Sequence, residues 1–444
     1  MKRRTFLQDT GLAVAGGFIV PTIVPNTVFG TTAPSNRINI GMMGFGRQAY
    51  HSNTKPFLSY DDVVITSVCD VDSWRMNKGK EMIESYYAKN APNGRYKGCK
   101  MYKDFRDMIE DKSIDAVMIS STDHWHVPMS LLSVKAGKDV CCEKPLTLSI
   151  EEGRLLADAV KEHKRVFRTD SEFRSIEGFH RMAELVRNGR VGKIQTIYVG
   201  VPKSDVTKEQ QPTMPVPSEL DYEMWCGPVD KEPYTLHRVH EPQNFNSRPG
   251  WMRVRNTSEG LITNWGTHLN DIAQWCNGTD RTGPVEVEAT GVYPPQENLW
   301  NVLLEMSATY KYADGTKLFY TMDRAYVKVI GDEGWIEYDY GKQALTASSD
   351  AILKSVIKET EIRFPLKHEK RDFIDAIKTR GETLEDAEVG HRTCSMCQIA
   401  HISIQLGGKK LKWDPDKELF DIREANVLKR RPSWRAPWTL ESFL

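Results

Sequence analysis

A short apolar segment followed by a glycine-rich turn constrains the fold of this chain more than any other feature. Residues 38–43 have the length and apolar character of a buried strand. They lead directly into a G-x-G-x-x-A pattern, Gly44-Phe45-Gly46-Arg47-Gln48-Ala49. The first glycine permits a tight turn, the second lets the main chain approach a pyrophosphate, and the small alanine lets a helix pack closely on the strand. The pattern therefore predicts the first unit of a dinucleotide-binding Rossmann sheet.

An acidic residue at the end of the next predicted strand supports this reading. Residues 63–69 form a second apolar run, and Asp70 follows it, 26 residues after Gly44. A carboxylate at this place accepts hydrogen bonds from both ribose hydroxyls and repels a 2'-phosphate, which favours NAD over NADP. Arg75 is the nearby cation that would weaken the preference. The alternative role for Asp70 is to cap the following helix.

Strand-like and helix-like runs continue to alternate, as a doubly wound parallel sheet requires. Residues 115–120 and 139–142 are predicted strands, with a helix between them at 128–136. Ligands of such sheets bind at the carboxyl ends of the strands, so residues 121–126 and 143–145 are expected to face one crevice.

Lys144 lies in this crevice between an acid and a proline, directly after an apolar strand. Surface lysines are ordinarily solvated, but this one would be held at the sheet edge. Its ammonium group can donate hydrogen bonds to a substrate hydroxyl and to the nicotinamide ribose. Lys144 is therefore a candidate catalytic residue.

The motifs around these strands resemble those of one oxidoreductase family. They are Ser121-Thr122-Asp123-His124-Trp125-His126, Lys135-Ala136-Gly137-Lys138, Glu143-Lys144-Pro145, Gly189-Arg190-Val191-Gly192-Lys193-Ile194 and residues 260–271. Together they resemble the glucose-fructose oxidoreductase, inositol dehydrogenase and MocA family, usually written Gfo/Idh/MocA. Thr122 stands where the family usually has proline. The resemblance covers nearly all of the chain after residue 30.

The resemblance implies a fold and a set of cofactor contacts. The expected fold is α/β, with a Rossmann domain at residues 31–170 and a C-terminal α+β domain at 171–444 that carries a mostly antiparallel open sheet. The expected cofactor contacts are Gly44, Phe45, Gly46, Arg47, Asp70, Ser121, Thr122, His126, Glu143 and Lys144. The family commonly uses one broad sheet face as its dimer contact, so a homodimer or homotetramer is expected.

The segment 260–271 carries the second part of the predicted catalytic site. Family members usually place an Asp and a His four residues apart here, on one helical face. His268 occupies the histidine position, whereas Asn264 stands where the Asp would be. An amide can orient a hydroxyl but cannot take its proton, so the general base would be His268 or Lys144. A full Lys-Asp-His triad is not expected.

Four further residues are candidates for contact with the substrate: His124, Trp125, Arg238 and Trp251. The region of Arg238 and Trp251 is rich in aromatic and basic residues, and sugar rings bind through apolar stacking plus directed hydrogen bonds. The alternative for this region is an ordinary Trp-rich core patch. His124 and His126 also have the spacing of a metal pair, but no carboxylate cluster completes a site, so no metal is expected.

The second domain shows strand-like runs at 195–200, 285–292, 303–310, 317–322 and 327–330, and helical runs at 373–377 and 388–405. No helices alternate with these strands, which favours an antiparallel sheet. Cys394-x-x-Cys397 stands without a second pair or a suitably spaced histidine, so helix packing is favoured over a zinc or redox role.

Composition excludes some partners. Lys and Arg total 60, as do Asp and Glu, so no net charge attracts nucleic acid or an anionic membrane. At 444 residues, two domains are expected.

The first thirty residues have the pattern of a twin-arginine signal peptide. Arg3 and Arg4 precede Phe6 and Leu7, and an apolar, small-residue run extends over residues 11–24. The alternative is a membrane anchor, but the run is shorter than the roughly 18 to 20 residues that span a bilayer. No later segment is apolar enough to span either. Export to the periplasm is the expectation, with cleavage near residue 30.

Export and NAD binding constrain each other, because the periplasm holds no ready pool of nicotinamide nucleotide. The cofactor would be loaded before export, held tightly and regenerated in place. The expected activity is oxidoreduction of a sugar or polyol hydroxyl. The alternative is hydrolysis or elimination of a glycoside through a 3-keto intermediate, a route that needs no pair of catalytic carboxylates and that NAD-dependent glycoside hydrolases of this fold use. A non-catalytic sugar-binding relative is the third reading.

Overall fold

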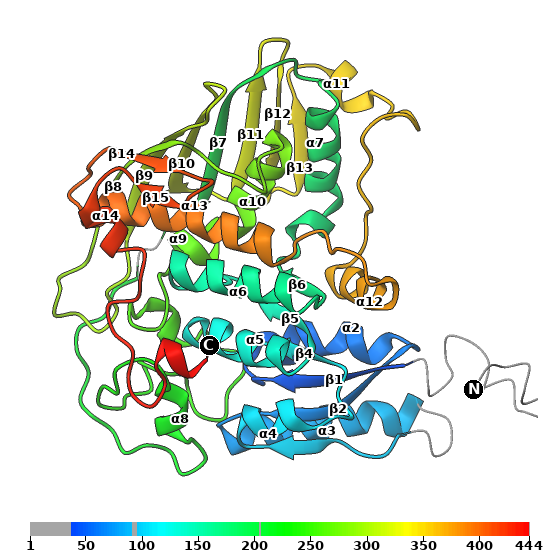
Figure 1. The fold of residues 1–444 in the computed structure, drawn as a ribbon, viewed down its shortest axis with the longest axis vertical. Helices are drawn as coiled ribbons and strands as arrows, with labels where there is room; N and C mark the ends of the chain where they lie inside the picture. Colours follow the sequence, from blue (N-terminus) through cyan, green and yellow to red (C-terminus); the bar gives the residue numbers. More distant parts are fainter. Residues whose placement is uncertain (1–36, 91–95, 204–205, 444) are drawn as a thin grey trace, which may run out of the picture. The chain divides into compact units, whose positions relative to one another are not determined.

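The computed structural model describes residues 37–90, 96–203 and 206–443, and the predicted signal segment 1–30 lies outside them. The first sheet has six parallel strands in the order β3-β2-β1-β4-β5-β6 (Figure 1). Its strands are β1 (Ile38–Met43), β2 (Val63–Cys69), β3 (Lys100–Tyr102), β4 (Ala116–Ile119), β5 (Asp139–Glu143) and β6 (Phe167–Asp170). The connecting helices are η3 (Ala49–Asn53), α2 (Thr54–Ser59), α3 (Ser73–Asn90), α4 (Phe105–Glu110), α5 (Asp123–Lys135) and α6 (Ile150–Glu162). The predicted doubly wound sheet is confirmed.

The strand order of this sheet reverses at β1, whose two neighbours are β2 and β4. Connections leave β1 and β4 toward opposite faces at such a point, which opens a crevice at the carboxyl ends of the strands. Apolar clusters cover both faces of the sheet, so the inner strands β1, β2 and β4 are largely buried and read as mostly apolar runs. The crevice is therefore rigidly framed.

The second sheet has nine strands in the order β13-β12-β11-β7-β10-β9-β8-β14-β15. They are β7 (Ile194–Pro202), β8 (Glu286–Val292), β9 (Glu305–Lys311), β10 (Lys317–Asp323), β11 (Tyr326–Gly331), β12 (Trp335–Asp339), β13 (Ala344–Ala347), β14 (Leu411–Asp414) and β15 (Leu419–Phe420). β7 and β10 are parallel and the other pairs antiparallel, so the predicted mostly antiparallel sheet is confirmed. The sequence analysis did not predict the four short strands β12 to β15.

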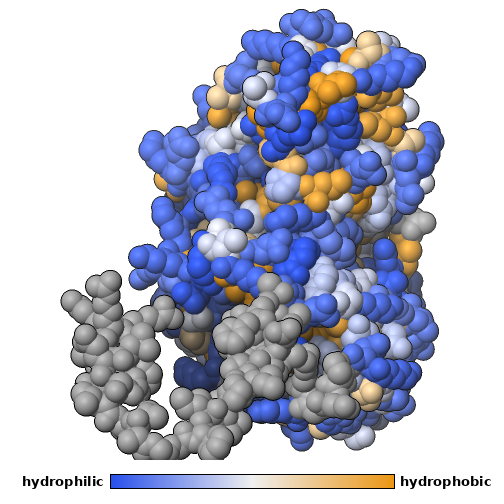
Figure 2. Space-filling model, turned by 90° about the vertical axis from the view of Figure 1, so that its right-hand side faces the viewer, coloured by the Kyte–Doolittle hydropathy of each residue, from blue (hydrophilic) through white to orange (hydrophobic). Residues whose placement is uncertain are grey.

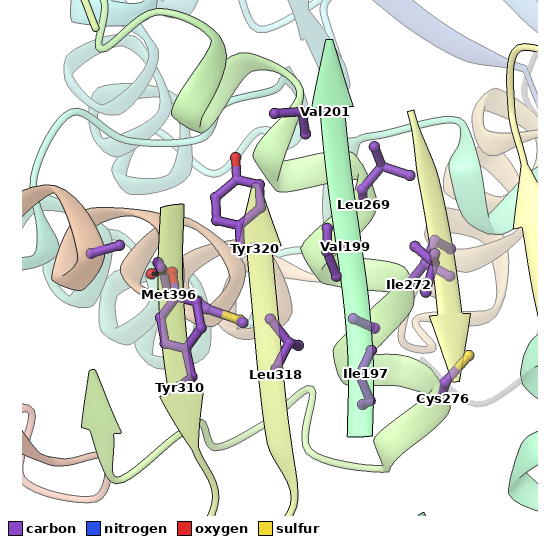
Figure 3. Packing of buried hydrophobic residues seen from close by; sticks show 14 of the residues in the cluster. Ile197, Val199, Val201, Leu269, Ile272, Cys276, Tyr310, Leu318, Tyr320 and Met396 are labelled. Atoms are coloured by element: carbon purple, nitrogen blue, oxygen red, sulfur yellow. Dashed lines mark hydrogen bonds between the residues drawn. The ribbon is translucent and has the colours of Figure 1, made fainter. Parts of the chain in front are cut away.

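One face of the second sheet carries its core. Alternate residues of β7, namely Ile197, Val199 and Val201, point toward α10 (Gly266–Asn277), which presents Leu269 and Ile272 (Figure 3). α7 (Glu177–Arg187) and α13 (Ala387–Gln405) contribute further apolar residues to the same cluster. The period of two along the strands and the amphipathic faces of these helices build this core.

Segments late in the chain pack against the first sheet. α12 (Glu369–Thr379) contacts β6, and α13 contacts both β6 and α6 (Figure 1). Near the end of the chain, Trp438 and Phe443 join the apolar cluster that contains Phe105 and Trp125. The C-terminal segments thus pack against β6 and α6 of the first domain. The shorter elements are η4 (Phe173–Ser175), α8 (Tyr222–Cys226), η5 (Gly250–Arg253), α9 (Leu261–Asn264), α11 (Asp350–Lys354), α14 (Arg423–Val427) and η6 (Leu440–Ser442).

A proline inside α5 explains why the C-terminal tail can bond to this helix. Pro128 has no N–H, so the carbonyl of His124 receives no hydrogen bond from within the helix. Arg431 donates to that carbonyl at 2.9 Å and also to the buried carboxylate of Glu152 at 2.7 Å. The tail is thereby bonded to α5 and α6.

The eight cysteines are all buried free thiols, and Cys394 and Cys397 lie within α13, in agreement with a packing role. Within residues 37–90, 96–203 and 206–443, no group of three or more potential metal-ligating side chains is found. In the same ranges no helix combines the length and the apolar character needed to cross a bilayer. On the face seen in Figure 2 hydrophilic residues predominate, with hydrophobic ones in separate patches.

Candidate active site

A cavity of about 300 Å³ opens at the carboxyl ends of the parallel strands. It reaches from the glycine turn after β1 to the helix α10 of the second domain. Its lining includes Gly44, Gly46, Arg47, Asp70, Ser121, Thr122, His126, Glu143, Lys144, Asn264 and His268, together with Trp125 and Trp251. Most of the residues predicted from the sequence therefore meet in one place, although their separate roles stay predictions.

The glycine turn has the geometry that a pyrophosphate needs. Gly44 has a φ of +80°, and a Cβ on it would lie 2.8 Å from the carbonyl oxygen of Ser120. A Cβ on Gly46 would meet no atom within 4 Å, so the main chain there borders open space. The N-terminal end of the following helix faces this space, and its N–H groups suit an anion. The turn therefore fits a dinucleotide.

Asp70 lies at the other side of the turn, directly after β2. Its carboxylate accepts from the N–H of Phe45 at 2.5 Å and from the N–H of Asp72 at 2.8 Å. Burial, and secondarily the charge of Asp72, raise its pKa to about 6. Asp70 therefore bonds the main chain just before α3 and lines the cavity, whereas the cap of α3 is Asp72, whose carboxylate accepts from the N–H of Arg75 at 3.1 Å.

Arg75, the cation that would favour NADP, is already engaged. Its guanidinium lies 3.6 Å from the Asp72 carboxylate and donates to the carbonyl of Asn244 at 3.0 Å. It also packs over the ring of Phe245, at 5.1 Å from the centroid. A group held in this way is poorly placed to turn toward a 2'-phosphate.

A loop of the second domain covers this end of the cavity. His240 bonds to the Asp72 carboxylate at 3.1 Å, and Phe245 stacks on Tyr50 with ring centroids 4.3 Å apart. Asn244, Ser247, Arg248, Pro249 and Met252 from the same stretch line the cavity. We call residues 240–252 the covering loop. It packs against the glycine turn and the helix that follows it, through the contacts of Phe245 with Phe45 and Tyr50.

Lys144 enters the cavity from the end of β5, and its peptide bond to Pro145 is cis. The ammonium donates to the main-chain carbonyl of Asn264 at 3.0 Å. The contact between positions 144 and 264 is thus made by the backbone of Asn264, and its amide lines the cavity. Any amino acid at position 264 would offer the same carbonyl.

His268 is held on two sides. Its Nδ1 is hydrogen-bonded to the hydroxyl of Ser171 at 2.8 Å, and its ring stacks on Phe173 at 4.2 Å. Burial, and after it the charge of Lys144, hold its pKa well below the usual value of 6.5. The imidazole is therefore neutral near pH 7 and able to accept a proton.

The helix expected to carry both Asn264 and His268 is interrupted. α9 ends at Asn264, α10 begins at Gly266, and Trp265 lies between them. Both side chains nevertheless reach the same cavity. Asn264 and His268 thus line one cavity without sharing a continuous helix, and their joint role stays a prediction.

Residues at the ends of β4 and β5 form a buried polar wall. Nδ1 of His126 lies 2.7 Å from the carbonyl oxygen of Pro145 and Nε2 lies 3.3 Å from that of Ser121. Burial lowers the pKa of His126 to about 4, so the ring is neutral and donates to one of these carbonyls, the nearer being that of Pro145. Glu143 accepts from Asn53 at 2.8 Å, and burial, then the charge of Asp170, raise its pKa to about 8. These contacts hold Glu143 and Pro145, the two sequence neighbours of Lys144.

Models of one family match most of the described chain. Residues 38–171 match the oxidoreductase family's NAD-binding Rossmann fold, and residues 201–440 match the family's C-terminal alpha/beta domain. The chain belongs to the Gfo/Idh/MocA family. The first domain is accordingly an NAD-binding Rossmann domain, and the residues around its glycine turn fit that cofactor.

Curated relatives in this family include dehydrogenases and hydrolases. The chain is 29% identical over 157 residues to a myo-inositol 2-dehydrogenase of Thermotoga maritima, covering 35% of this chain and 42% of that protein. It is 26% identical over 181 residues to a glycosyl hydrolase family 109 protein of Shewanella pealeana, covering 37% and 38%. The matched segments thus span less than half of these relatives.

Solved structures share the fold over most of the chain. An aldose-aldose oxidoreductase from Caulobacter crescentus, complexed with glycerol, has a TM-score of 0.62 at 16% identity and covers 85% of this chain and 99% of its own. A levoglucosan dehydrogenase in complex with NADH and levoglucosan has a TM-score of 0.59 at 16% identity, with coverage of 85% and 99%. At these identities the likeness concerns the fold.

The four candidate substrate residues of this family member separate into two pairs. Trp125 and Trp251 line the cavity. His124 is fully buried and bonded to the carbonyl of Trp225 at 3.0 Å, and Arg238 donates to the carbonyl of Pro233 at 3.3 Å. Neither of these two is among the residues that line the cavity. His124 and His126 are each committed to main-chain carbonyls.

Several lining residues were not found from the sequence of this Gfo/Idh/MocA protein. Glu172 and Phe173 come just after β6, whose sequence Phe-Arg-Thr-Asp is not an apolar run, so no local pattern pointed to them. Trp265 lies next to Asn264 in a motif already singled out. Tyr340 follows β12 of the second sheet, and no local pattern connects it with the cavity.

A second, polar cavity of about 520 Å³ adjoins the first. The two share Gln48, Glu143 and Glu172. The remaining lining is largely polar and includes Asp170 and Lys370, which form a fully buried ion pair. The carboxyl ends of β5 and β6 therefore separate two cavities.

Proposed function

We propose that this protein is an NAD(H)-dependent oxidoreductase acting on the hydroxyl of a sugar, glycoside or polyol. One observation carries the proposal: Lys144 and His268 line the same cavity as the glycine turn and Asp70. A cofactor bound along the turn would thus have its reactive end beside a cation and a neutral base, which is what the oxidation of an alcohol requires.

The residues divide the chemistry between them. NAD, when bound, supplies the hydride acceptor. Lys144 donates a hydrogen bond to the substrate oxygen and stabilises the negative charge that develops there. His268 takes the hydroxyl proton, because its low pKa keeps it neutral. Of the two bases that the sequence left open, this arrangement favours His268.

Aromatic side chains favour a ring-shaped, hydroxyl-rich substrate. Phe173, Trp265 and Tyr340 line the cavity together, with Phe173 stacked on Tyr340 at 4.9 Å. Sugar rings present C–H faces that stack on such surfaces, while their hydroxyls bond to polar neighbours. The myo-inositol dehydrogenase among the relatives acts on a ring of this kind.

The cofactor is NAD rather than NADP, and it is held tightly. Asp70 faces the ribose position and Arg75 is engaged by Asp72, which supports NAD. The covering loop bonds across the cavity to the Rossmann domain, which supports slow release of a bound dinucleotide.

We also propose that the protein is exported to the periplasm by the twin-arginine route. Arg3, Arg4 and the apolar run after them support the proposal, and slow cofactor release fits a compartment without free NAD. Cell fractionation tests it. Replacing Arg3 and Arg4 by Lys should leave the protein in the cytoplasm, and an unchanged periplasmic fraction would refute the route.

A homodimer or homotetramer is proposed through the outer face of the nine-stranded sheet. Tyr198 and Phe319 stack there at 5.2 Å, on the side opposite the residues that face α10. Analytical ultracentrifugation is the test. Tyr198→Glu should yield monomers, whereas an unchanged sedimentation coefficient would move the interface elsewhere.

The alternative activity is cleavage of a glycoside through a 3-keto intermediate. The similarity to a family 109 glycosyl hydrolase favours it. The same Lys144 and His268 would serve the first oxidation. Leaving-group release from aryl glycosides without net NADH formation would make this the better description.

The direct test combines cofactor analysis and turnover. Mass spectrometry of nucleotide released from the purified protein should detect NAD, and sugars or polyols should change the absorbance at 340 nm. Protein that carries no nucleotide and gives no absorbance change with any sugar would refute the oxidoreductase.

A further inference from the structure

Because position 264 is an asparagine, it offers no carboxylate to compensate the charge of His268 after that residue takes a proton. Lys144 bonds to the main chain of Asn264, so this position supplies no negative charge to the site. When His268 takes a proton from a substrate, the imidazolium forms beside the Lys144 ammonium. A buried cation next to another cation is unfavourable unless an anion compensates it.

Four carboxylates line the cavity: those of Asp70, Asp123, Glu143 and Glu172. Asp70 is bonded to the glycine turn, and Glu143 is bonded to Asn53. Asp123 is 2% exposed at the start of α5. Among the described acids that line this cavity, Glu172 is the one that lies within ion-pair distance of His268.

Glu172 brings its carboxylate close to the catalytic ring. Its Oε2 lies 3.8 Å from Nδ1 of His268, and its side chain is 45% exposed, open to the cavity. The neighbours on either side fix this position, because Ser171 bonds to Nδ1 and Phe173 stacks on the imidazole. Three consecutive residues after β6 therefore surround one edge and one face of His268.

We infer that Glu172 is the positioning residue that compensates the charge of protonated His268, in place of an acid at position 264. The inference rests on the proposed oxidoreductase function. Among the described residues no hydrogen bond reaches Nε2 of His268, which leaves that nitrogen for the substrate proton. Nδ1 then carries the second proton of the imidazolium, toward Ser171 and the Glu172 carboxylate.

Two charged groups face His268 and act in opposite directions. Lys144, from the end of β5, disfavours the imidazolium, and Glu172, from the end of β6, favours it. Phe173 stacks on His268 and also on Tyr340, so the Phe173 ring separates Tyr340 from His268. Three residues further along α10, Asp271 is paired with Arg174 at 2.6 Å, so its charge is already compensated. Glu172 is thus the group whose removal should make His268 a weaker base.

Kinetics provide the first test. Glu172→Gln should lower kcat about tenfold with little change in KM, and should move the acid limb of the kcat profile about one unit lower, as loss of a charged neighbour predicts. Glu172→Asp should recover part of the rate. Glu177→Gln removes the same charge five residues on, at an exposed site of α7, and should leave rate and profile unchanged.

Nuclear magnetic resonance provides a test that needs no turnover. In protein with labelled histidines, the His268 signal, assigned through a His268→Gln variant, should titrate at a lower pH in Glu172→Gln than in the unmodified protein. Glu177→Gln should not move it.

The outcomes separate this inference from the proposed function. An inactive protein whose His268 titration still responds to Glu172→Gln would refute the function and retain the coupling. An active protein in which Glu172→Gln changes neither the pH profile nor the His268 titration would overturn the inference. A folded Glu172→Gln variant with a changed KM alone would overturn it as well, because Glu172 would then act in substrate binding.

Discussion

At the scale of residues, the effect of a substitution depends on whether the residue acts through its backbone or through its side chain. Asn264 bonds Lys144 through its carbonyl oxygen, whereas Lys144 acts through its ammonium group. Substitution at 264 keeps the first contact, and substitution at 144 removes both the cation and the contact. The two positions should therefore respond very differently.

Lys144→Ala should lower kcat/KM by about 10³-fold, within the range for loss of a group that acts in the transition state. Asn264→Ala should lower it only about three- to tenfold, the value of one hydrogen bond to a substrate hydroxyl. Steady-state kinetics and cofactor titration check both. Lys112→Ala, at an exposed site, is the control. Equal losses at 144 and 264 would contradict the assignment.

Asp70 makes cofactor affinity depend on pH. Its pKa of about 6 means that the carboxyl is protonated below that pH without cofactor. Ribose hydroxyls donate to the charged form, so bound NAD lowers this pKa and releases a proton. Affinity for NAD should therefore rise with pH up to about 6, by at most about tenfold per unit, and level off above. Calorimetry at several pH values measures it, and Asp70→Asn should abolish the slope.

At the scale of elements, the C-terminal tail and the covering loop hold the cavity together. The tail bonds to α5 at the carbonyl that Pro128 leaves open, and the loop packs an aromatic ring onto the helix after the glycine turn. Both contacts join segments far apart in sequence. Each offers a substitution with a clear expected effect.

Arg431→Ala should destabilise the protein by about 3 kcal/mol, because it removes the cation paired with the buried Glu152 carboxylate and the donor to the His124 carbonyl. Arg430→Ala is the matched control. Arg430 pairs with Glu151 at 2.9 Å, but its side chain is 69% exposed, so its loss should cost about 0–1 kcal/mol. Urea unfolding distinguishes the two, and equal effects would refute the buried anchor.

Phe245→Ala should speed the release of NAD at least about tenfold, since the covering loop loses its stacking on Tyr50 and its contact with Arg75. Stopped-flow fluorescence of bound NADH measures the rate. Val216→Ala, at an exposed position outside the loop, should leave it unchanged. A release rate unaffected by Phe245→Ala would mean that the loop does not retain the cofactor.

At the scale of the whole molecule, the two domains together form one cavity. For an NAD-binding protein that is exported, as proposed, the cofactor in this cavity must stay bound between turnovers. An exported enzyme that releases its cofactor would lose it. Protein purified from the periplasm should therefore retain about one NAD per chain through gel filtration, measured by acid release and mass spectrometry. Recovery of empty protein that binds NAD only at millimolar concentration would contradict tight retention.

The Rossmann half and its glycine turn were predictable because they depend on local rules: apolar strands, a turn that needs Gly44, and an acid at the end of β2. Lys144 followed from the same reasoning. The second domain was predictable in class, since its alternating residues indicate an antiparallel sheet, but its short edge strands carry too few residues to give a periodic signal.

The sequence by itself determined the fold class, the cofactor turn and the identity of Lys144 and His268 as candidates, because each is encoded within a few neighbouring residues. Only the tertiary structure decided that Asn264 serves Lys144 through its backbone, that His124 and Arg238 lie off the cavity lining, and that Glu172 and Tyr340 reach it. These facts depend on how β6, α10 and the second sheet pack against one another. No local pattern records the distance between two segments that meet only after folding.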